Sequence, residues 1–264
     1  MKKWYAVLGH PIHHSISPRM HEAWFQKYNI EASYVPILVK PGELEKAVDS
    51  LKLLGCSGFN VTVPYKEEII PFLNELDVSA KVAGAVNTVV NRDGQLIGHN
   101  TDGRGLLANI SGLSEEKRVL VIGAGGAAKG IVAALKERHI RTLFIANRTL
   151  EKAVQLAEWA SGTAITYSQA EDMFSTFDIV IQTTSVGMEE DISPVNLKGW
   201  HPSMTAIDII YSPPETAFLR QAREEGAFTM NGLSMLIGQG ALAFELWTGI
   251  YPDQDYCKKT VFSS

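Results

Sequence analysis

The sequence predicts an α/β protein of two domains. Its 264 residues, 45% of them hydrophobic, are enough to bury two cores. Strand-like apolar runs alternate with helix-like segments over about the first hundred residues and again from Lys117 onward. A glycine-rich turn at residues 123–128 separates an apolar run from a helix-like stretch. We therefore expect one α/β domain followed by a doubly wound parallel sheet.

The first domain, expected over residues 1–104, begins with three strand-like runs separated by two helices. The strands are Tyr5–Leu8, Ser33–Val39 and Phe59–Val63, and the helices are Pro18–Tyr28 and Glu43–Leu54. Ser17 is expected to cap the first helix, with Pro18 at the first helical position. A hairpin turning at Asp93-Gly94 joins Ala85–Val90 to Gln95–Gly98 and closes the domain.

The second domain, expected over residues 105–237, repeats the alternation. Strands are predicted near Val119, Leu143, Ile179 and Ala206, and helices near Ile131, Val154 and Leu219. The last periodic segment, Met235–Trp247, has no strand after it. We expect this segment to return to the first domain, which residues 238–264 would complete.

The turn at residues 123–128 has the pattern of a dinucleotide-binding loop. Gly123-Ala124-Gly125-Gly126-Ala127-Ala128 follows the apolar run 119–122 and opens the helix-like stretch 129–135. Glycines let backbone N–H groups approach pyrophosphate oxygens, and the first helical turn adds a positive dipole end. Such turns also occur for packing alone, so the order of strand, turn, helix and strand decides the interpretation. It predicts a Rossmann-type domain with a nicotinamide cofactor.

The end of the next strand indicates which nicotinamide cofactor is bound. Thr142–Ala146 is followed by Asn147-Arg148-Thr149, at the point where an NAD site usually has an Asp or Glu. An arginine can bind a 2′-phosphate bidentately. Taken by itself, Arg148 is better explained as a solvated surface residue, but together with the glycine turn it predicts NADP.

Composition excludes several classes of function. A net charge of −5 without a long basic run argues against a nucleic-acid partner, and no segment approaches a membrane span. Cys56 and Cys257 are isolated, which fits a reducing compartment, and the apolar stretch at the start is too short for a signal peptide, so we expect the cytoplasm. No histidine cluster has zinc-ligand spacing, and no Gly-x-Ser-x-Gly elbow indicates a hydrolase.

Polar residues gather near the predicted ends of first-domain strands, where ligands of open α/β sheets bind. Ser15 and Ser17 lie two residues apart and so face one side of an extended segment. Helix capping would explain Ser17 but not Ser15. Asn60 and Thr62 alternate on one face of a strand. These residues predict a site for a small molecule that carries hydroxyls or a carboxylate.

Two further residues are candidates for proton transfer. Lys66 lies at a predicted helix start, where the dipole and partial burial disfavour an ammonium and suit lysine to acid/base work. The alternative is an exposed lysine paired with Glu67 or Glu68. Asp102 stands at another predicted helix start, where N-capping explains it equally well. Asn87 is either a turn residue or a ligand contact.

Taken together, these segments resemble the shikimate dehydrogenases over almost the whole chain. The resemblance is carried by Pro11–Pro18, Asn60–Lys66, Gly84–Thr88, Asn100–Gly103, the glycine turn, Asn147–Thr149, and Gly232–Leu236 with Gln239. It implies NADPH-dependent, reversible reduction of 3-dehydroshikimate to shikimate, a step of chorismate and aromatic amino acid biosynthesis. Lys66 would be the acid/base, assisted by Asp102.

The resemblance also implies the ligand contacts. Ser15 and Ser17 would bind the substrate carboxylate, and the residues around the ring hydroxyls would be Asn60, Thr62, Lys66, Asn87, Asp102, Tyr211 and Gln239. The pyrophosphate and the 2′-phosphate would be held by Gly123, Ala124, Gly125, Gly126, Ala127, Asn147, Arg148, Thr149 and Lys152. The residues near the nicotinamide would be Ile209, Gly232 and Met235.

The chain departs from the family pattern at two places, and two other functions stay open. Glu22 and Gln182 stand where asparagine is more usual. A related dehydrogenase that prefers quinate is one alternative, although the paired serines favour shikimate. A catalytically idle NADP-sensing module is the other, and the intact Lys66 and Asp102 argue against it. Monomer and homodimer are both compatible with the sequence.

Overall fold

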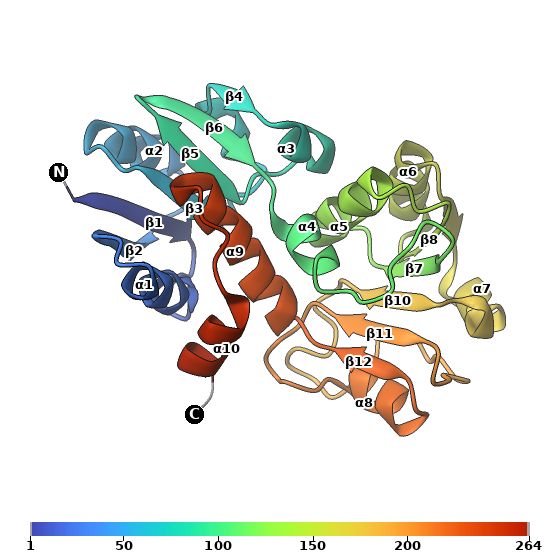
Figure 1. Cartoon of the computed structure of the whole chain (residues 1–264). Helices are drawn as coiled ribbons and strands as arrows, with labels where there is room; N and C mark the ends of the chain where they lie inside the picture. Colours follow the sequence, from blue (N-terminus) through green and yellow to red (C-terminus); the bar gives the residue numbers. More distant parts are fainter. Residues whose placement is uncertain (1, 263–264) are drawn as a thin grey trace. The chain divides into compact units, whose positions relative to one another are not determined.

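A computed structural model describes residues 2–262, so the parts of the predicted domains at residues 1 and 263–264 lie outside the described residues. The chain divides into two compact units, Met1–Gly105 with Ile237–Ser264, and Leu106–Leu236. Each unit contains a six-stranded sheet with helices on its faces (Figure 1). The chain passes between the units within two helices, α4 (Asp102–Leu107) and α9 (Leu233–Thr248).

The sheet of the first unit is mixed, with the strand order β2-β1-β3-β5-β6-β4. Its strands are β1 (Lys3–Gly9), β2 (Ala32–Leu38), β3 (Gly58–Val61), β4 (Glu75–Leu76), β5 (Thr88–Arg92) and β6 (Gln95–His99). β2, β1 and β3 are parallel, while β5 runs antiparallel to both β3 and β6. Asp93 and Gly94 have φ of 51° and 87°, as a type I′ hairpin turn requires, so the predicted hairpin is confirmed.

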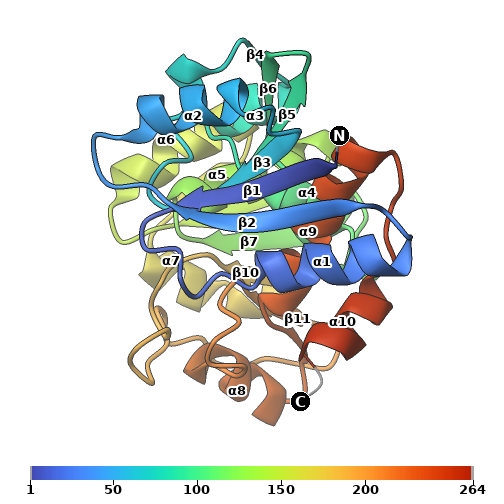
Figure 2. The ribbon, with the colours of Figure 1, turned by 90° about the vertical axis from the view of Figure 1, so that its left-hand side faces the viewer.

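Helices cover both faces of this sheet, and Figure 2 shows α2 (Leu44–Leu53) and α1 (Ser17–Lys27) on opposite sides of β1 and β2. Successive side chains of β1 point to opposite faces of the sheet, and Leu8 packs in a cluster with Val48 of α2 on one face. Tyr5 faces the other way and stacks on Phe25 of α1 and Trp247 of α9. The remaining helices are α3 (Val78–Ala83), the 3₁₀ helix η1 (Ile70–Phe72) and α10 (Gln254–Phe262).

Three sequence expectations for the first unit were wrong in detail. Ser17 is the first residue of α1 rather than its cap; Ile16 precedes the helix, and no side chain caps it. β3 ends at Val61 instead of residue 63, because the segment 63–69 is a series of turns around Pro64. The strand expected from Ala85 begins only at Thr88, because α3 ends at Ala83 and residues 85–87 connect it to β5.

The sheet of the second unit is entirely parallel, with the order β12-β11-β10-β7-β8-β9. Its strands are β7 (Arg118–Ile122), β8 (Thr142–Ala146), β9 (Thr163–Ile165), β10 (Ile179–Gln182), β11 (Thr205–Asp208) and β12 (Phe228–Met230). The first strand in sequence lies at the centre, and the two halves extend outward from it. This is the doubly wound order of a Rossmann-type sheet, as predicted.

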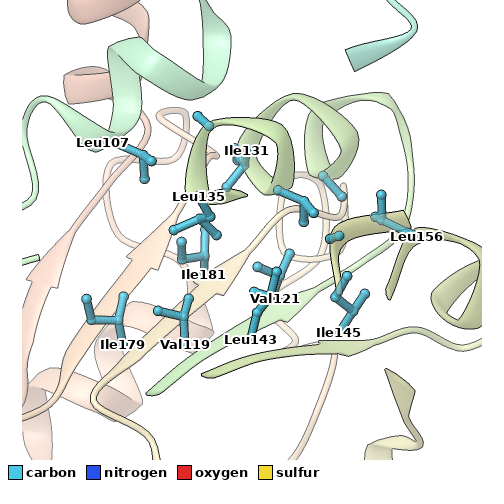
Figure 3. Close-up of a cluster of buried hydrophobic side chains, with 14 of the residues drawn as sticks. Leu107, Val119, Val121, Ile131, Leu135, Leu143, Ile145, Leu156, Ile179 and Ile181 are labelled. Atoms are coloured by element: carbon cyan, nitrogen blue, oxygen red, sulfur yellow. The ribbon is translucent and has the colours of Figure 1, made fainter. Parts of the chain in front are cut away.

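Strand alternation divides the core of the second unit into two clusters. Val119 and Val121 of β7 pack with α5 (Gly126–Glu137) and α6 (Leu150–Ala160) on one face, which Figure 3 shows. Leu120 and Ile122 face the opposite side, toward a cluster that includes Phe218 of α8 (Ala217–Glu224). The other helices are α7 (Tyr167–Asp172) and the 3₁₀ helix η2 (Phe174–Thr176).

Candidate active site and cofactor site

A buried network of amides and hydroxyls lies at one end of the first sheet. Asn60, in β3, is 6% exposed, and its side-chain Nδ2 donates to the Asn87 carbonyl oxygen at 3.0 Å and to Thr88 Oγ1 at 3.1 Å. Its Oδ1 accepts a hydrogen bond from the Tyr34 hydroxyl at 2.6 Å. These three hydrogen bonds therefore fix the orientation of the Asn60 amide, with its nitrogen toward Asn87 and Thr88 and its oxygen toward Tyr34.

Asn87 connects this network to a carboxylate. Its Nδ2 donates to Asp102 Oδ1 at 2.8 Å and to Thr101 Oγ1 at 2.9 Å, while its Oδ1 accepts from the Thr101 backbone N–H at 2.8 Å. Gln239 Oε1, from α9, lies 3.4 Å from the same Nδ2. Asn87 is therefore more than a turn residue, because its buried amide orients a carboxylate, while its contact with a ligand stays a prediction.

Lys66 and Asp102 form an ion pair, with 2.6 Å between Nζ and Oδ2. The Lys66 side chain is 30% exposed and the Asp102 side chain 9% exposed. Asp102 begins α4, as expected, and its carboxylate faces Lys66 and Asn87. A proton donor with partial access to solvent thus lies beside a buried carboxylate, which is an arrangement suited to general acid/base chemistry.

The expected helix start at Lys66 was wrong. Lys66 lies in the turns at residues 63–69, where Ile69 N–H donates to the Tyr65 carbonyl, and only the short 3₁₀ helix η1 follows. Pro64 and Pro71 bound this stretch and leave too few residues for an α-helix. The Lys66 backbone is instead held by its carbonyl oxygen, which accepts a 2.7 Å hydrogen bond from the Val86 N–H.

The serines and Thr62 lie in segments that follow the parallel strands β1 and β3. Ser15 is half-buried in the loop before α1, and its N–H donates to the Ile12 carbonyl at 3.0 Å. Ser17 is buried at the first position of α1. The Thr62 N–H donates to the Leu8 carbonyl at 2.9 Å, which ties the two strand ends together. The carboxyl ends of parallel strands meet at one edge, so these hydroxyls share an edge of the first sheet.

In the second unit, the glycine turn connects β7 to α5 and exposes Gly125 and Gly126. Gly123 has a φ of 113°, and a side chain there would approach Thr183 Oγ1. A Cβ at Gly125 would meet no described atom within 4 Å, and no side chain of residues 2–262 caps α5. The N–H groups of this helix start are therefore open to an anion, which fits a pyrophosphate. Ala128 is fully buried in the core, so a methyl is accommodated at this position.

The segment after β8 presents two cationic side chains. Arg148 and Lys152 are both exposed, one before α6 and one in its first turn. Asn147 Nδ2 donates to the Thr149 carbonyl oxygen at 2.9 Å and shapes this loop. Burial raises the pKa of the Tyr167 phenol, and a hydrogen bond from the Arg148 backbone partly offsets it, which places Tyr167 against the loop.

The segments after β11 and β12 approach each other closely. A Cβ at Gly232 would clash with the Ile209 carbonyl oxygen, so only glycine fits there. The Gly232 N–H donates to the Ile210 carbonyl at 3.0 Å. Tyr211 is 39% exposed, and Met235 lies in the first turn of α9, half-buried. Tyr211 belongs to the second unit, so its place beside the polar network of the first unit stays a prediction.

The sequence reasoning missed residues that hold these loops in place. Asp208, fully buried at the end of β11, accepts hydrogen bonds from the Ile210 N–H at 2.9 Å and from Thr216 Oγ1 at 2.7 Å. Burial raises its pKa to about 6. Gln182 Nε2 donates to the Thr184 and Val186 carbonyls and so shapes the loop after β10. Asp208 could have been found from the sequence, because it is a carboxylate at the end of an apolar strand.

Comparisons with known proteins identify the family. Residues 7–89 match the shikimate dehydrogenase substrate binding domain, residues 106–208 the shikimate / quinate 5-dehydrogenase family, and residues 232–262 the shikimate 5′-dehydrogenase C-terminal domain. The chain is 46% identical over 271 residues to a shikimate dehydrogenase (NADP(+)) of Geobacillus sp. (strain WCH70), covering 99% of this chain and 98% of the relative. The chain belongs to the shikimate dehydrogenase family.

Solved structures agree with this membership. A shikimate 5-dehydrogenase from Thermus thermophilus in complex with NADP(H) and shikimate is 34% identical, with a TM-score of 0.90 and coverage of 98% of each chain. A quinate dehydrogenase from Corynebacterium glutamicum in complex with NAD is 29% identical, with a TM-score of 0.90, 100% coverage of this chain and 99% of that one. The predicted family, the two-domain α/β fold class and the assignment to the NADP-dependent oxidoreductases are confirmed.

Two features of other protein classes are absent from the part of the chain that the structure describes. Within residues 2–262, no helix combines the length and apolar character needed to cross a membrane. Over the same described residues, no group of three or more His, Cys, Asp and Glu side chains is placed to hold a metal ion.

Proposed function

We propose that this chain catalyses the NADPH-dependent, reversible reduction of 3-dehydroshikimate to shikimate, with Lys66 and Asp102 as the acid/base pair. The observation that carries the proposal is the 2.6 Å contact between Lys66 Nζ and Asp102 Oδ2 within a buried polar network. The family relationship supports the substrate and the cofactor. The reaction belongs to chorismate and aromatic amino acid biosynthesis.

In the proposed mechanism, the Lys66 ammonium donates a proton to the oxygen of the substrate ketone as this oxygen gains negative charge. Asp102 holds the ammonium in place through its Oδ2, and Asn87 fixes the carboxylate through Oδ1. The cofactor supplies the hydride when it is bound. The contribution of the protein is a preorganised donor at the developing charge, which lowers the barrier without reorganising solvent.

The remaining polar residues of the first unit provide recognition. Ser15 and Ser17 would bind the substrate carboxylate, since each hydroxyl can donate one hydrogen bond. Asn60, Thr62, Asn87 and Gln239 would contact the ring hydroxyls, together with Tyr211 of the second unit. The burial of Asn60 and Asn87 supports this role, because buried amides give strongly directional contacts.

The second unit would hold NADP through its backbone and its cations. The residues 123–127 would contact the pyrophosphate, and Asn147, Arg148, Thr149 and Lys152 the 2′-phosphate. Ile209, Gly232 and Met235 would lie near the nicotinamide. The open N-terminus of α5 and the exposed Arg148 support this assignment, since both offer donors to phosphate oxygens.

The test is a spectrophotometric assay of cofactor reduction, with shikimate or quinate offered against NADP⁺ or NAD⁺. We expect kcat/KM to be highest for shikimate with NADP⁺. Higher kcat/KM with quinate would establish the alternative that the quinate dehydrogenase likeness raises. NADP⁺ binding without turnover of either substrate would instead favour an NADP-sensing module and would overturn the proposed reaction.

The proposal includes the ligands of the enzyme, its compartment and its oligomeric state. The ligands are a small substrate and NADP, with no nucleic-acid or membrane partner. Both thiols are buried, which fits the reducing conditions of the cytoplasm. A monomer and a homodimer are both compatible with the proposed reaction, and size-exclusion chromatography with light scattering distinguishes them.

A further inference from the structure

Tyr34 connects the edge of the first sheet to the polar network at its centre. It lies on β2, in register with Tyr5 of β1, while Asn60 of β3 is in register with Val7 of β1. Tyr5 and Val7 are two residues apart, so Tyr34 and Asn60 share one face of the sheet. The Tyr34 side chain crosses β1 on this face, and its hydroxyl reaches Asn60 Oδ1 at 2.6 Å.

The direction of this hydrogen bond follows from the other contacts of Asn60. The Asn87 carbonyl can only accept, so the atom of Asn60 that contacts it at 3.0 Å is the amide nitrogen. The oxygen of the amide therefore faces Tyr34, and the phenol must be the donor. Tyr34 is 1% exposed, and burial raises its pKa well above the usual value, so the phenol keeps its proton.

The ring of Tyr34 is held in place by a neighbouring aromatic ring. It stacks on the imidazole of His21, with 4.4 Å between ring centroids and 6° between planes. Burial lowers the pKa of His21 to about 3, so this imidazole is neutral, and neither ring nitrogen has a hydrogen-bond partner among the described residues. The neutral His21 ring thus packs face to face against Tyr34 and fixes the plane of the phenol ring. A hydrogen-bonding contact with the Ser17 side chain lowers the pKa of the Tyr34 phenol and so partly offsets the effect of burial.

We propose that Tyr34 is a positioning residue for substrate binding, whose phenol O–H sets the orientation of the Asn60 amide. Without this donor, Oδ1 of Asn60 is left unpaired in a buried site, and the amide turns toward other donors. The contacts to Asn87 and Thr88 then weaken. The inference rests on the proposed function, in which Asn60 contacts the ring hydroxyls of the substrate.

The first test is Tyr34→Phe, which removes the hydroxyl and keeps the ring that stacks on His21. We expect the KM for shikimate to rise about 5- to 20-fold, as loss of one buried hydrogen bond implies, while the KM for NADP⁺ stays within about 2-fold. Tyr5→Phe is the matched control. Tyr5 is 1% exposed in the neighbouring strand and stacks on Phe25 and Trp247, so the same deletion there leaves the KM for shikimate unchanged.

A double-mutant cycle distinguishes positioning from general loosening of the fold. In an Asn60→Ala background, Tyr34→Phe has no amide to orient, so it adds less than about 2-fold to the KM for shikimate. Independent, multiplying effects of the two substitutions would overturn the proposal. An unchanged KM for Tyr34→Phe in the parent protein would overturn it as well.

A second readout separates this inference from the proposed function. The side-chain amide signals of Asn60 and Asn87 in ¹H–¹⁵N NMR spectra, assigned by substitution, shift in Tyr34→Phe and stay in place in Tyr5→Phe if Tyr34 orients the amide. Shifted signals in a protein that does not oxidise shikimate would refute the proposed reaction and leave the orientation by Tyr34 standing. Unshifted signals would refute the inference alone.

Discussion

The two units of this protein place polar groups at the ends of similar six-stranded sheets, yet they do so in different ways. In the first unit, side chains form a buried network in which Asn60 and Asn87 each make several hydrogen bonds. In the second unit, the open groups are the backbone N–H groups before α5 and the exposed Arg148. Directional side chains suit a small ring with hydroxyls, whereas backbone dipoles and a cation suit a phosphate.

Each unit also buries an ionisable group whose pKa is shifted, and the two groups differ in kind. Burial lowers the pKa of His21 in the first unit to about 3 and raises the pKa of Asp208 in the second to about 6. Both groups are therefore shifted toward their neutral forms, because a buried charge is costly. The two shifts have opposite consequences for stability as the pH falls.

The largest expected effect is in the first unit. Replacing Lys66 by alanine should lower kcat roughly 10²- to 10⁴-fold, the usual contribution of an acid/base group, with little change in either KM. Steady-state kinetics with shikimate and NADP⁺ measure this, and Lys81→Ala, an exposed lysine of α3, is the control. Near-full turnover by the Lys66 variant would remove this residue from the proposed role.

The next effect concerns the cation of the second unit. Arg148→Ala should raise the KM for NADP⁺ about 10- to 100-fold, which is the range for a charge-assisted hydrogen bond, and leave the KM for NAD⁺ nearly unchanged. Arg138→Ala, at the other end of α5, should alter neither value. Equal losses for both cofactors would show that Arg148 does not select the 2′-phosphate.

Alanine substitutions at two glycines of the second unit distinguish a role in backbone packing from a role in cofactor binding. Gly232→Ala forces a methyl against the Ile209 carbonyl and should lower the free energy of unfolding by about 1–3 kcal/mol. Gly125→Ala has open space around its Cβ, so it should preserve stability and weaken NADP⁺ binding alone. Urea unfolding and NADP⁺ titration of both variants test this. A stable Gly232→Ala variant would contradict the close approach.

The smallest effects are in the pH dependence of stability. The folded form of Asp208 binds a proton more tightly than the unfolded chain, so its contribution to stability is present below pH 3.8 and is lost as the pH rises through about 6. Because of Asp208, the free energy of unfolding of the parent protein should fall by roughly 1–2 kcal/mol between pH 4 and 6, and Asp208→Asn should abolish this fall. Urea unfolding of both proteins at several pH values gives the difference.

His21 should act in the opposite sense. Its folded form binds a proton less tightly, so its contribution is present above pH 6.5 and is lost as the pH falls toward about 3. His21→Phe, which keeps an aromatic ring, should make the first unit less sensitive to acid in the same unfolding series. The same acid sensitivity in both proteins would show that His21 is not the group that titrates.

Strong local patterns in the sequence predicted much of the fold. The Asp93-Gly94 turn, the apolar run at residues 119–122 and the glycine turn each specify their structure through neighbouring residues. β9 and β12 were missed because three-residue strands have too few positions for a period to be recognised. Ser17 was expected as the cap of α1 but is its first residue, because a serine near a helix start can make other contacts than capping. Lys66 was placed wrongly at a helix start, because Pro64 begins a series of turns instead of a helix.

The sequence by itself determined the alternation of strands and helices, the parallel second sheet and the residue types at the strand ends, because these depend on local periodicity and backbone preference. Only the tertiary structure decided which side chains meet. Lys66 and Asp102 are 36 positions apart, and Tyr34 and Asn60 are 26 apart. Their contacts depend on strand order and register, and a hydrogen bond requires a separation near 3 Å, which no sequence spacing specifies.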